Sequence, residues 1–107
     1  MEILDIWINC PDEATADRIA DALIARRLVA CSNRYAAIES AWHWQGAVER
    51  GREVPLLLKT RAALFDRVAK AARALHPFEL PAITAVPVAA ATADYRDWVI
   101  AETEAAD

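Results

Sequence analysis

Residues 28–60 hold two long extended segments on either side of Gly46, and neither segment repeats its apolar residues with the period of a helix. This pattern predicts a long β-hairpin that turns near Gly46. A hairpin of this length extends beyond the body of a domain of 107 residues. Its apolar side chains then need cover from outside one chain, so the sequence predicts an oligomer.

The predicted hairpin strands alternate, and the alternation assigns each side chain to one face. One face of the first strand carries Ile38, Ser40, Trp42 and Trp44. The other face of that strand carries Glu39, Ala41 and His43. On the second strand, one face carries Val54, Leu56 and Leu58 and the other carries Glu53, Leu57 and Lys59. Pro55 has no backbone N–H to donate, which predicts an edge position or a bulge at that residue.

A helix is predicted before the hairpin, after an extended segment at residues 3–9. Residues 11–13 open the helix with a proline and two acidic residues, which complement the helix dipole. Its buried face follows the i, i+3, i+4, i+7 spacing through Ala16, Ile19, Ala20 and Leu23, with Ile24 at its margin. Arg26 and Arg27 fall in the predicted last turn, where positive charge is favoured.

Two further helices and one strand are predicted after the hairpin. Thr60 is the expected cap of the second helix, whose apolar stripe ends at Leu75. His76 precedes a proline, and the residue before proline is pushed out of the helical region. Residues 83–88 read as a strand, and Thr92 or Asp94 is expected to cap a short last helix.

The resulting order is β-α-β-β-α-β with a terminal helix. That order is typical of the split βαβ, or ferredoxin-like, α+β sandwich. Right-handed crossovers place both main helices on one face of the sheet and leave the other face bare in a monomer. We therefore expect one ferredoxin-like domain over residues 1–107, with a protruding hairpin and a short C-terminal helix. Trp7, Trp42 and Trp44 are expected to need cover on the bare face or at the hairpin tip.

Composition narrows the class of partner. Hydrophobic residues make up 56% of the chain and the mean hydropathy is +0.11, which again favours an interface. The net charge of −4 and the pI near 5.1 argue against nucleic acid, which would require a basic surface. No segment resembles a signal peptide or approaches the ~20 apolar residues of a spanning helix. We expect a cytoplasmic protein without a membrane partner, whose two cysteines are reduced and unpaired.

Several enzyme classes lack their motifs in this chain. Gly46 and Gly51 are its only glycines, so it has no glycine-rich phosphate-binding loop and no dinucleotide-binding glycine pattern. G-x-S-x-G and H-E-x-x-H are also absent, which leaves no nucleophile with a recognisable base. An acylphosphatase, another enzyme on this fold, is disfavoured because no glycine-rich phosphate-binding loop can form. An RNA-binding RRM is disfavoured because the aromatic and basic RNP pattern is absent. The sequence therefore predicts a protein that is not an enzyme.

A set of short motifs, taken in order and at matching spacing, carries a family resemblance. They comprise residues 9–14, 27–33, 44–46, 57–60, 75–81 and 94–99. Together they resemble the CutA family, the divalent-cation tolerance proteins. The resemblance implies a ferredoxin-like protomer in a tight homotrimer whose hairpins pair between subunits. It also implies a link to tolerance of copper and other divalent cations.

The chain departs from the family pattern at four places. Alanines stand at 36 and 37 where the family usually has a Pro-Gly turn, and Pro55 stands where leucine is common. Phe78 replaces a tyrosine and Ala82 replaces a glutamate. The last two changes remove a phenol and a carboxylate from the surroundings of His76.

Four residues are candidate metal ligands: His76, Cys31, Cys10 and Glu79. The first three each have a structural alternative. His76 lies at a helix end with Glu79 close by, and imidazole binds metals; alternatively, it interacts with the last helical carbonyls. Cys31 is a soft ligand for copper or zinc, or a small buried residue. Cys10 is a ligand or redox-sensitive thiol at a helix start, or a plain turn residue. The two cysteines lack CxxC spacing, so the residues alone leave these alternatives open.

Two functions follow from the residues and the resemblance together. The first is a trimeric cytoplasmic protein that binds divalent cations, with copper as the leading ion, and requires no cofactor. The second is a regulatory or scaffold trimer, similar in architecture to PII signalling proteins. Its intersubunit clefts would hold a small molecule or a partner protein. The residues expected at such an interface or cleft are Trp42, Trp44, Lys59 and Phe78.

Overall fold

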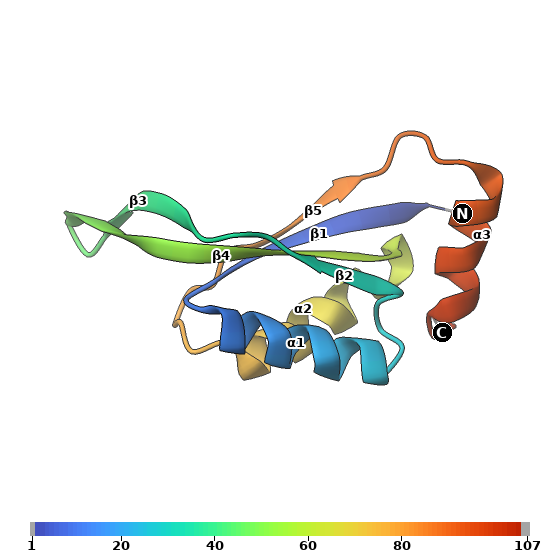
Figure 1. Cartoon of the computed structure of the whole chain (residues 1–107), viewed down its shortest axis with the longest axis horizontal. Coiled ribbons are helices and arrows are strands. Elements are labelled where there is room, and N and C mark those ends of the chain that lie inside the picture. Colours follow the sequence, from blue (N-terminus) through green and yellow to red (C-terminus); the bar gives the residue numbers. More distant parts are fainter. Residues whose placement is uncertain (1, 106–107) are drawn as a thin grey trace.

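The computed structural model describes residues 2–105, and its elements follow the predicted order (Figure 1). The first half comprises β1 (Ile3–Cys10), α1 (Glu13–Ala25), β2 (Cys31–Arg34), β3 (Ile38–Trp44) and β4 (Ala47–Arg61). The second half comprises a 3₁₀ turn (Ala62–Leu64), α2 (Phe65–Leu75), β5 (Ile83–Pro87) and α3 (Ala93–Glu102). The predicted first hairpin strand is therefore divided into β2 and β3.

All strand pairs in the sheet are antiparallel, in the order β2-β4-β1-β5, and β3 pairs with the outer part of β4. Helices α1 and α2 lie side by side on one face, and α3 lies at the end of the sheet far from the hairpin (Figure 1). This is the predicted ferredoxin-like α+β sandwich. None of the helices within residues 2–105 is both long and apolar enough to cross a membrane.

The core lies between the sheet and the two main helices. Its central side chains are fully buried and include Ile6, Ile8, Leu56 and Leu58 from the sheet, with Ile19, Leu23, Leu64 and Val68 facing them. Each such side chain contributes about 1.5–3 kcal/mol relative to exposure. The apolar face of β1 thus packs against the predicted apolar face of α1. Ile24, predicted at the margin of that face, is instead 40% exposed, because it lies on the side of α1 away from the core.

The opposite sheet face is only partly bare. Trp7 packs against Tyr35 on this face, with ring centroids 5.3 Å apart. Lys59 and Asp5, which are register partners, form an ion pair of 2.9 Å. Near the far end, the Tyr95 hydroxyl of α3 lies 3.8 Å from the Cys31 sulfur. Aromatic residues and α3 therefore supply some of the cover that the sequence assigned to an outside partner.

A bulge separates β2 from β3. Arg34 pairs with Leu56 and Ile38 pairs with Glu53, so three residues, 35–37, lie opposite two residues of β4. Pro55 sits at this point, and its carbonyl accepts a hydrogen bond from Tyr35 N–H at 2.9 Å. The missing N–H of Pro55 thus falls where the ladder is already interrupted. Of the two predicted settings, the bulge is confirmed, and Pro55 is on a central strand rather than an edge.

Beyond the bulge, β3 and residues 47–53 form an arm that projects from the body (Figure 1). The arm turns through Gln45 and Gly46, whose φ angles are +49° and +82°. Positive φ at both central residues suits a two-residue hairpin loop, and glycine adopts it without strain. The arm gives the molecule an extent of 45 Å along its long axis against 25 and 23 Å along the others.

Two of the predicted helix-end roles differ in the structure, and a third, that of Thr92, is confirmed in position only. Thr60 does not cap α2, because it lies within β4 and its hydroxyl donates to the Leu28 carbonyl at 2.7 Å. Arg26 and Arg27 follow α1 instead of forming its last turn. Arg27 adopts φ +54°, and its guanidinium bonds the carboxylate and carbonyl of Glu102. Thr92 is the first residue before α3, but its side chain makes no capping bond to the helix backbone.

Candidate functional site

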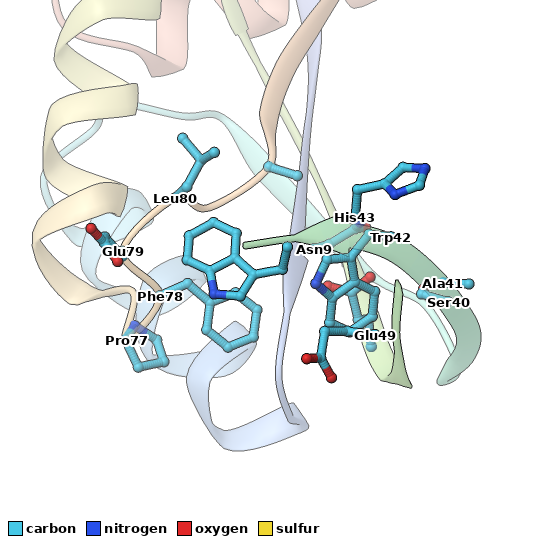
Figure 2. A pocket seen from close by; sticks show the side chains of 13 residues that line it. Asn9, Ser40, Ala41, Trp42, His43, Glu49, Pro77, Phe78, Glu79 and Leu80 are labelled. Atoms are coloured by element: carbon cyan, nitrogen blue, oxygen red, sulfur yellow. The ribbon is translucent and has the colours of Figure 1, made fainter. Parts of the chain in front are cut away.

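A cavity of about 800 Å³ lies between the arm and the loop that follows α2 (Figure 2). The arm supplies one wall, with side chains that include Trp42, Trp44, Glu49 and Glu53. Residues 77–80 supply the other wall, and Asn9 at the end of β1 lies between them. Cavities of this size hold small molecules in many proteins, so this is the candidate site.

The strand register of the arm decides which of its side chains reach the cavity. Trp42 pairs with Glu49 and Trp44 pairs with Ala47, so the tryptophans and Glu49 share one face. His43 pairs with Val48 on the opposite face, and Figure 2 shows its imidazole directed away from Phe78 and Pro77. The predicted separation of His43 from the two tryptophans is confirmed. His43 therefore lines the cavity without aiming its ring into it.

Gly51 shapes the same face of the arm. A Cβ atom built on Gly51 would lie 3.3 Å from Cη2 of the Trp42 indole. That separation is tighter than an ordinary van der Waals contact, so the ring occupies space that a larger residue would need. Gly51 thus allows the Trp42 indole to lie close to the strand.

His76 anchors the loop wall. The imidazole is buried, and Nε2–H donates to the Asn9 carbonyl at 2.8 Å. Nδ1 in turn accepts from the Phe78 N–H at 3.2 Å. The His76 and Phe78 rings also contact each other, with centroids 4.9 Å apart. A neutral imidazole with both nitrogens engaged therefore fixes the end of α2 to β1 and orients Phe78 toward the arm.

The charged side chains that line the cavity are all acidic. Its lining carries the carboxylates of Glu49, Glu53 and Glu79, and no lysine or arginine among the described residues lines it. The arginines of the arm, Arg50 and Arg52, lie on the opposite face, where Arg52 pairs with Glu39 at 3.3 Å. The cavity is consequently a region of negative potential with aromatic walls.

The two cysteines lie apart from each other and neither is in a disulfide. Cys10 is fully buried, and burial raises the pKa of its thiol to about 11, assisted by the charges of Asp12 and Glu53. Cys31 is half-buried beside Tyr95. Burial, together with the Cys31 contact, raises the pKa of the Tyr95 phenol to about 12. Burial therefore favours the protonated form of the Cys10 thiol in the chain without a bound metal.

The structure does not bring the four predicted metal ligands together. His76 uses both ring nitrogens within the chain, Cys10 lies in the core and Cys31 lies beside α3. Among residues 2–105, no group of three or more His, Cys, Asp or Glu side chains is arranged to hold a metal ion. One chain alone thus does not fit a divalent-ion centre on these residues. A site that uses any of them stays a prediction that requires ligands from another copy.

The predicted interface residues divide into two groups. Trp42, Trp44 and Phe78 line the cavity, whereas Lys59 lies on the sheet face, paired with Asp5. Glu49 was missed by the sequence analysis as a cavity residue. Its place follows once the turn is set at Gln45 and Gly46, because counting back from the turn pairs Glu49 with Trp42. Phe78 of the loop wall was predicted as a cleft residue, but no local signal shows that this loop meets the arm, because α2 and β1 bring it there from elsewhere in the chain.

Comparison with known proteins places the whole body and the arm in one family. A family model described as CutA1 divalent ion tolerance protein matches residues 4–102. The chain is 38% identical over 94 residues to the divalent-cation tolerance protein CutA of Thermus thermophilus, covering 88% of this chain and 91% of that protein. It is 35% identical over 98 residues to protein CutA of Mus musculus, covering 92% of this chain but 55% of that longer protein.

Solved structures agree with the sequence matches. The Thermus thermophilus protein superposes with a TM-score of 0.91 at 38% identity, covering 97% of this chain and all of that one. CutA from Xylella fastidiosa superposes with a TM-score of 0.93 at 33% identity, with 97% and 100% coverage. The matched range contains the arm, the cavity and His76. The chain belongs to the CutA1 family of divalent ion tolerance proteins.

Proposed function

We propose that this protein acts in divalent-cation tolerance as a cytoplasmic homotrimer without catalytic activity. The observation that supports the trimer most is the arm. Within residues 2–105, β3 pairs with β4 alone, so its outer edge is open. Three large apolar side chains of the arm are also exposed: Ile38 at 43%, Trp42 at 36% and Val48 at 58%.

An isolated two-stranded ribbon is marginally stable in water, and an open apolar edge invites pairing with another chain. Pairing of each arm with the next copy would cover the open edge and the side chains of Ile38 and Val48. A head-to-tail contact of this kind closes into a ring when the rotation between successive copies divides a full turn. The family resemblance favours a ring of three.

The test is native mass spectrometry of the purified chain at micromolar concentration. We expect a mass three times the 11.8 kDa of one chain. Ile38→Glu places a charge in the proposed arm contact and is expected to shift the protein to the mass of one chain. Ala74→Glu, on an exposed position of α2, serves as the matched control and keeps the trimer. A monomeric wild type would contradict the proposal, and a trimeric Ile38→Glu variant would move the contact away from the arm.

We further propose that the trimer binds divalent ions. Because one chain does not supply a ligand set, we place the ions between copies of the trimer, with copper as the first ion to test. Adding Cu(II) in slight excess before native mass spectrometry is expected to give a trimer that carries whole multiples of three ions. Graded adducts without a preferred number would argue against a defined, symmetric site.

One observation favours a second candidate function, the scaffold or regulatory trimer that holds a small molecule. The cavity of about 800 Å³ has aromatic walls and lies where the arm meets the body. Its size suits a small organic ligand. A ligand that binds only the native state raises the melting temperature by mass action, so a thermal-shift screen tests this function. A screen without any stabilising compound would count against it.

A further inference from the structure

We propose that the cavity between the arm and residues 77–80 binds an organic cation, an alkylated ammonium group held by aromatic faces and carboxylates. This inference rests on the second candidate function and names its ligand class. The aromatic side chains in the lining are Trp42, Trp44 and Phe78. Indole and phenyl faces attract a cation through their quadrupoles, with tryptophan the most effective.

The carboxylates of the cavity favour a ligand with a positive charge. Glu49 and Glu53 stand on the arm, Glu79 stands on the loop, and none of the three forms a salt bridge within residues 2–105. Figure 2 shows Glu49 on the arm side and Glu79 on the side of α2. An anion would be repelled by the carboxylates of Glu49 and Glu53 on the arm wall, whereas a cation would be attracted to them. On the loop wall, the Arg73 guanidinium donates to the Glu79 carbonyl at 3.0 Å, so the arm supplies most of the negative charge.

The lining also distinguishes an organic cation from a metal ion. A hard divalent cation needs several oxygen ligands that converge at 2.0–2.6 Å, as a general rule of its coordination. The described residues contain no such cluster of three or more acidic, Cys or His side chains. An alkylammonium group needs no converging ligands, because its charge is spread over methyl groups that pack against apolar surface. Trp42, Phe78 and Leu80 offer that surface, with 36%, 39% and 66% of their areas exposed.

The two faces of the arm add a further argument. The face toward the cavity carries glutamates and tryptophans, and the opposite face carries Arg50, Arg52 and His43. Alternation in a β-strand makes this segregation possible, but it does not require it. Keeping the arginines off the cavity face leaves its carboxylates free for an outside cation.

The experiment titrates choline chloride into the ¹⁵N-labelled oligomer as it exists in solution and follows the indole N–H signals by NMR. The chain has four tryptophans, so two of the signals act as internal controls. We expect saturable shifts for Trp42 and Trp44 and none for Trp7 or Trp98, which lie on the sheet face and on α3. Phenylalanine substitutions assign each signal. The uncharged isostere 3,3-dimethylbutan-1-ol is expected to produce no saturable shift.

Variants test the carboxylate and the ring position. Glu49→Gln is expected to weaken choline binding about threefold or more, because a close charge is lost. Glu39→Gln, on the opposite face of the same arm, is the matched control and leaves binding unchanged. Gly51→Ala displaces the Trp42 indole by a few tenths of an ångström and is expected to weaken binding without unfolding the protein.

Each outcome decides the proposal. If choline produces no saturable shifts, the proposal is wrong. If the uncharged alcohol binds as tightly as choline, the cavity recognises apolar groups and not a cation. If MgCl₂ produces the same shifts as choline, the site binds inorganic cations. The mass of the oligomer is measured on the same sample. A trimer that ignores choline defeats this inference alone, and a monomer that binds choline defeats the proposed trimer alone.

Discussion

His76 joins three parts of the chain through one ring: the end of α2, the Asn9 carbonyl and the Phe78 amide. Replacing it with alanine would leave the carbonyl and the amide without these partners and open space beside Phe78. We expect His76→Ala to lower the free energy of unfolding by about 2–4 kcal/mol, measured by urea denaturation. His43→Ala, on the exposed arm, should stay within about 0.5 kcal/mol of wild type. Equal losses in the two variants would contradict this structural role.

The buried Cys10 thiol is expected to make the stability of the fold depend on pH in the alkaline range. Its pKa in the folded chain is raised to about 11 from 9.0, so the unfolded chain releases this proton first as the pH rises. The unfolded state then binds fewer protons than the folded state, and stability falls with increasing pH in this window. Urea midpoints at about pH 8 and pH 10 should therefore show a larger loss for wild type than for Cys10→Ala. Parallel losses would mean that the thiol is not held protonated by burial.

At the scale of the elements, α1 begins with a side-chain cap. The Thr15 N–H donates to the Asp12 carboxylate at 2.7 Å, and this bond holds the pKa of Asp12 below its usual 3.8. A lowered folded-state pKa gives stability that is present above about pH 4 and is lost as the pH falls further. We expect Asp12→Ala to lower the melting temperature at pH 7, whereas Asp12→Asn retains the cap. If Asp12→Asn lost stability at low pH as steeply as wild type, protonation of the Asp12 carboxylate would not be the cause of the acid sensitivity.

The elements also show why some sequence predictions succeeded. The two faces of the hairpin were predictable because alternation in a strand is local, and the register confirms the assignment of Trp42 against His43. The prediction that Thr60 caps α2 was wrong, because the outcome at this residue depends on contacts between segments that are distant in the sequence. β4 continues through Thr60 because β1 and β2 pair with it on both sides, and those partners are distant in the sequence. Tertiary pairing therefore overrode a local capping signal.

At the scale of the whole molecule, the order of elements and the ferredoxin-like sandwich were predictable, because each helix and strand carries its own period. The cavity was not predictable in the same way. Glu49 and Phe78 are far apart in the sequence, and both line the cavity only because α2 returns its C-terminal end to Asn9, near the end of β1. Leu80 and Asn9 fall within the motifs at residues 75–81 and 9–14, but neither motif shows that these two segments meet beside the arm.

The continuous course of β4 has a mechanical consequence. One strand of 15 residues runs from the tip of the arm, through the centre of the sheet, to Arg61. There, the Arg61 guanidinium is bonded to the Ile100 and Thr103 carbonyls of the last helical segment. A force on the arm tip would travel along covalent bonds to the opposite end of the molecule. Between the arm and the body, the pairing of β4 with its neighbour is interrupted at the bulge of residues 35–37. We expect bending of the arm to concentrate at this bulge, because fewer backbone hydrogen bonds hold β4 there.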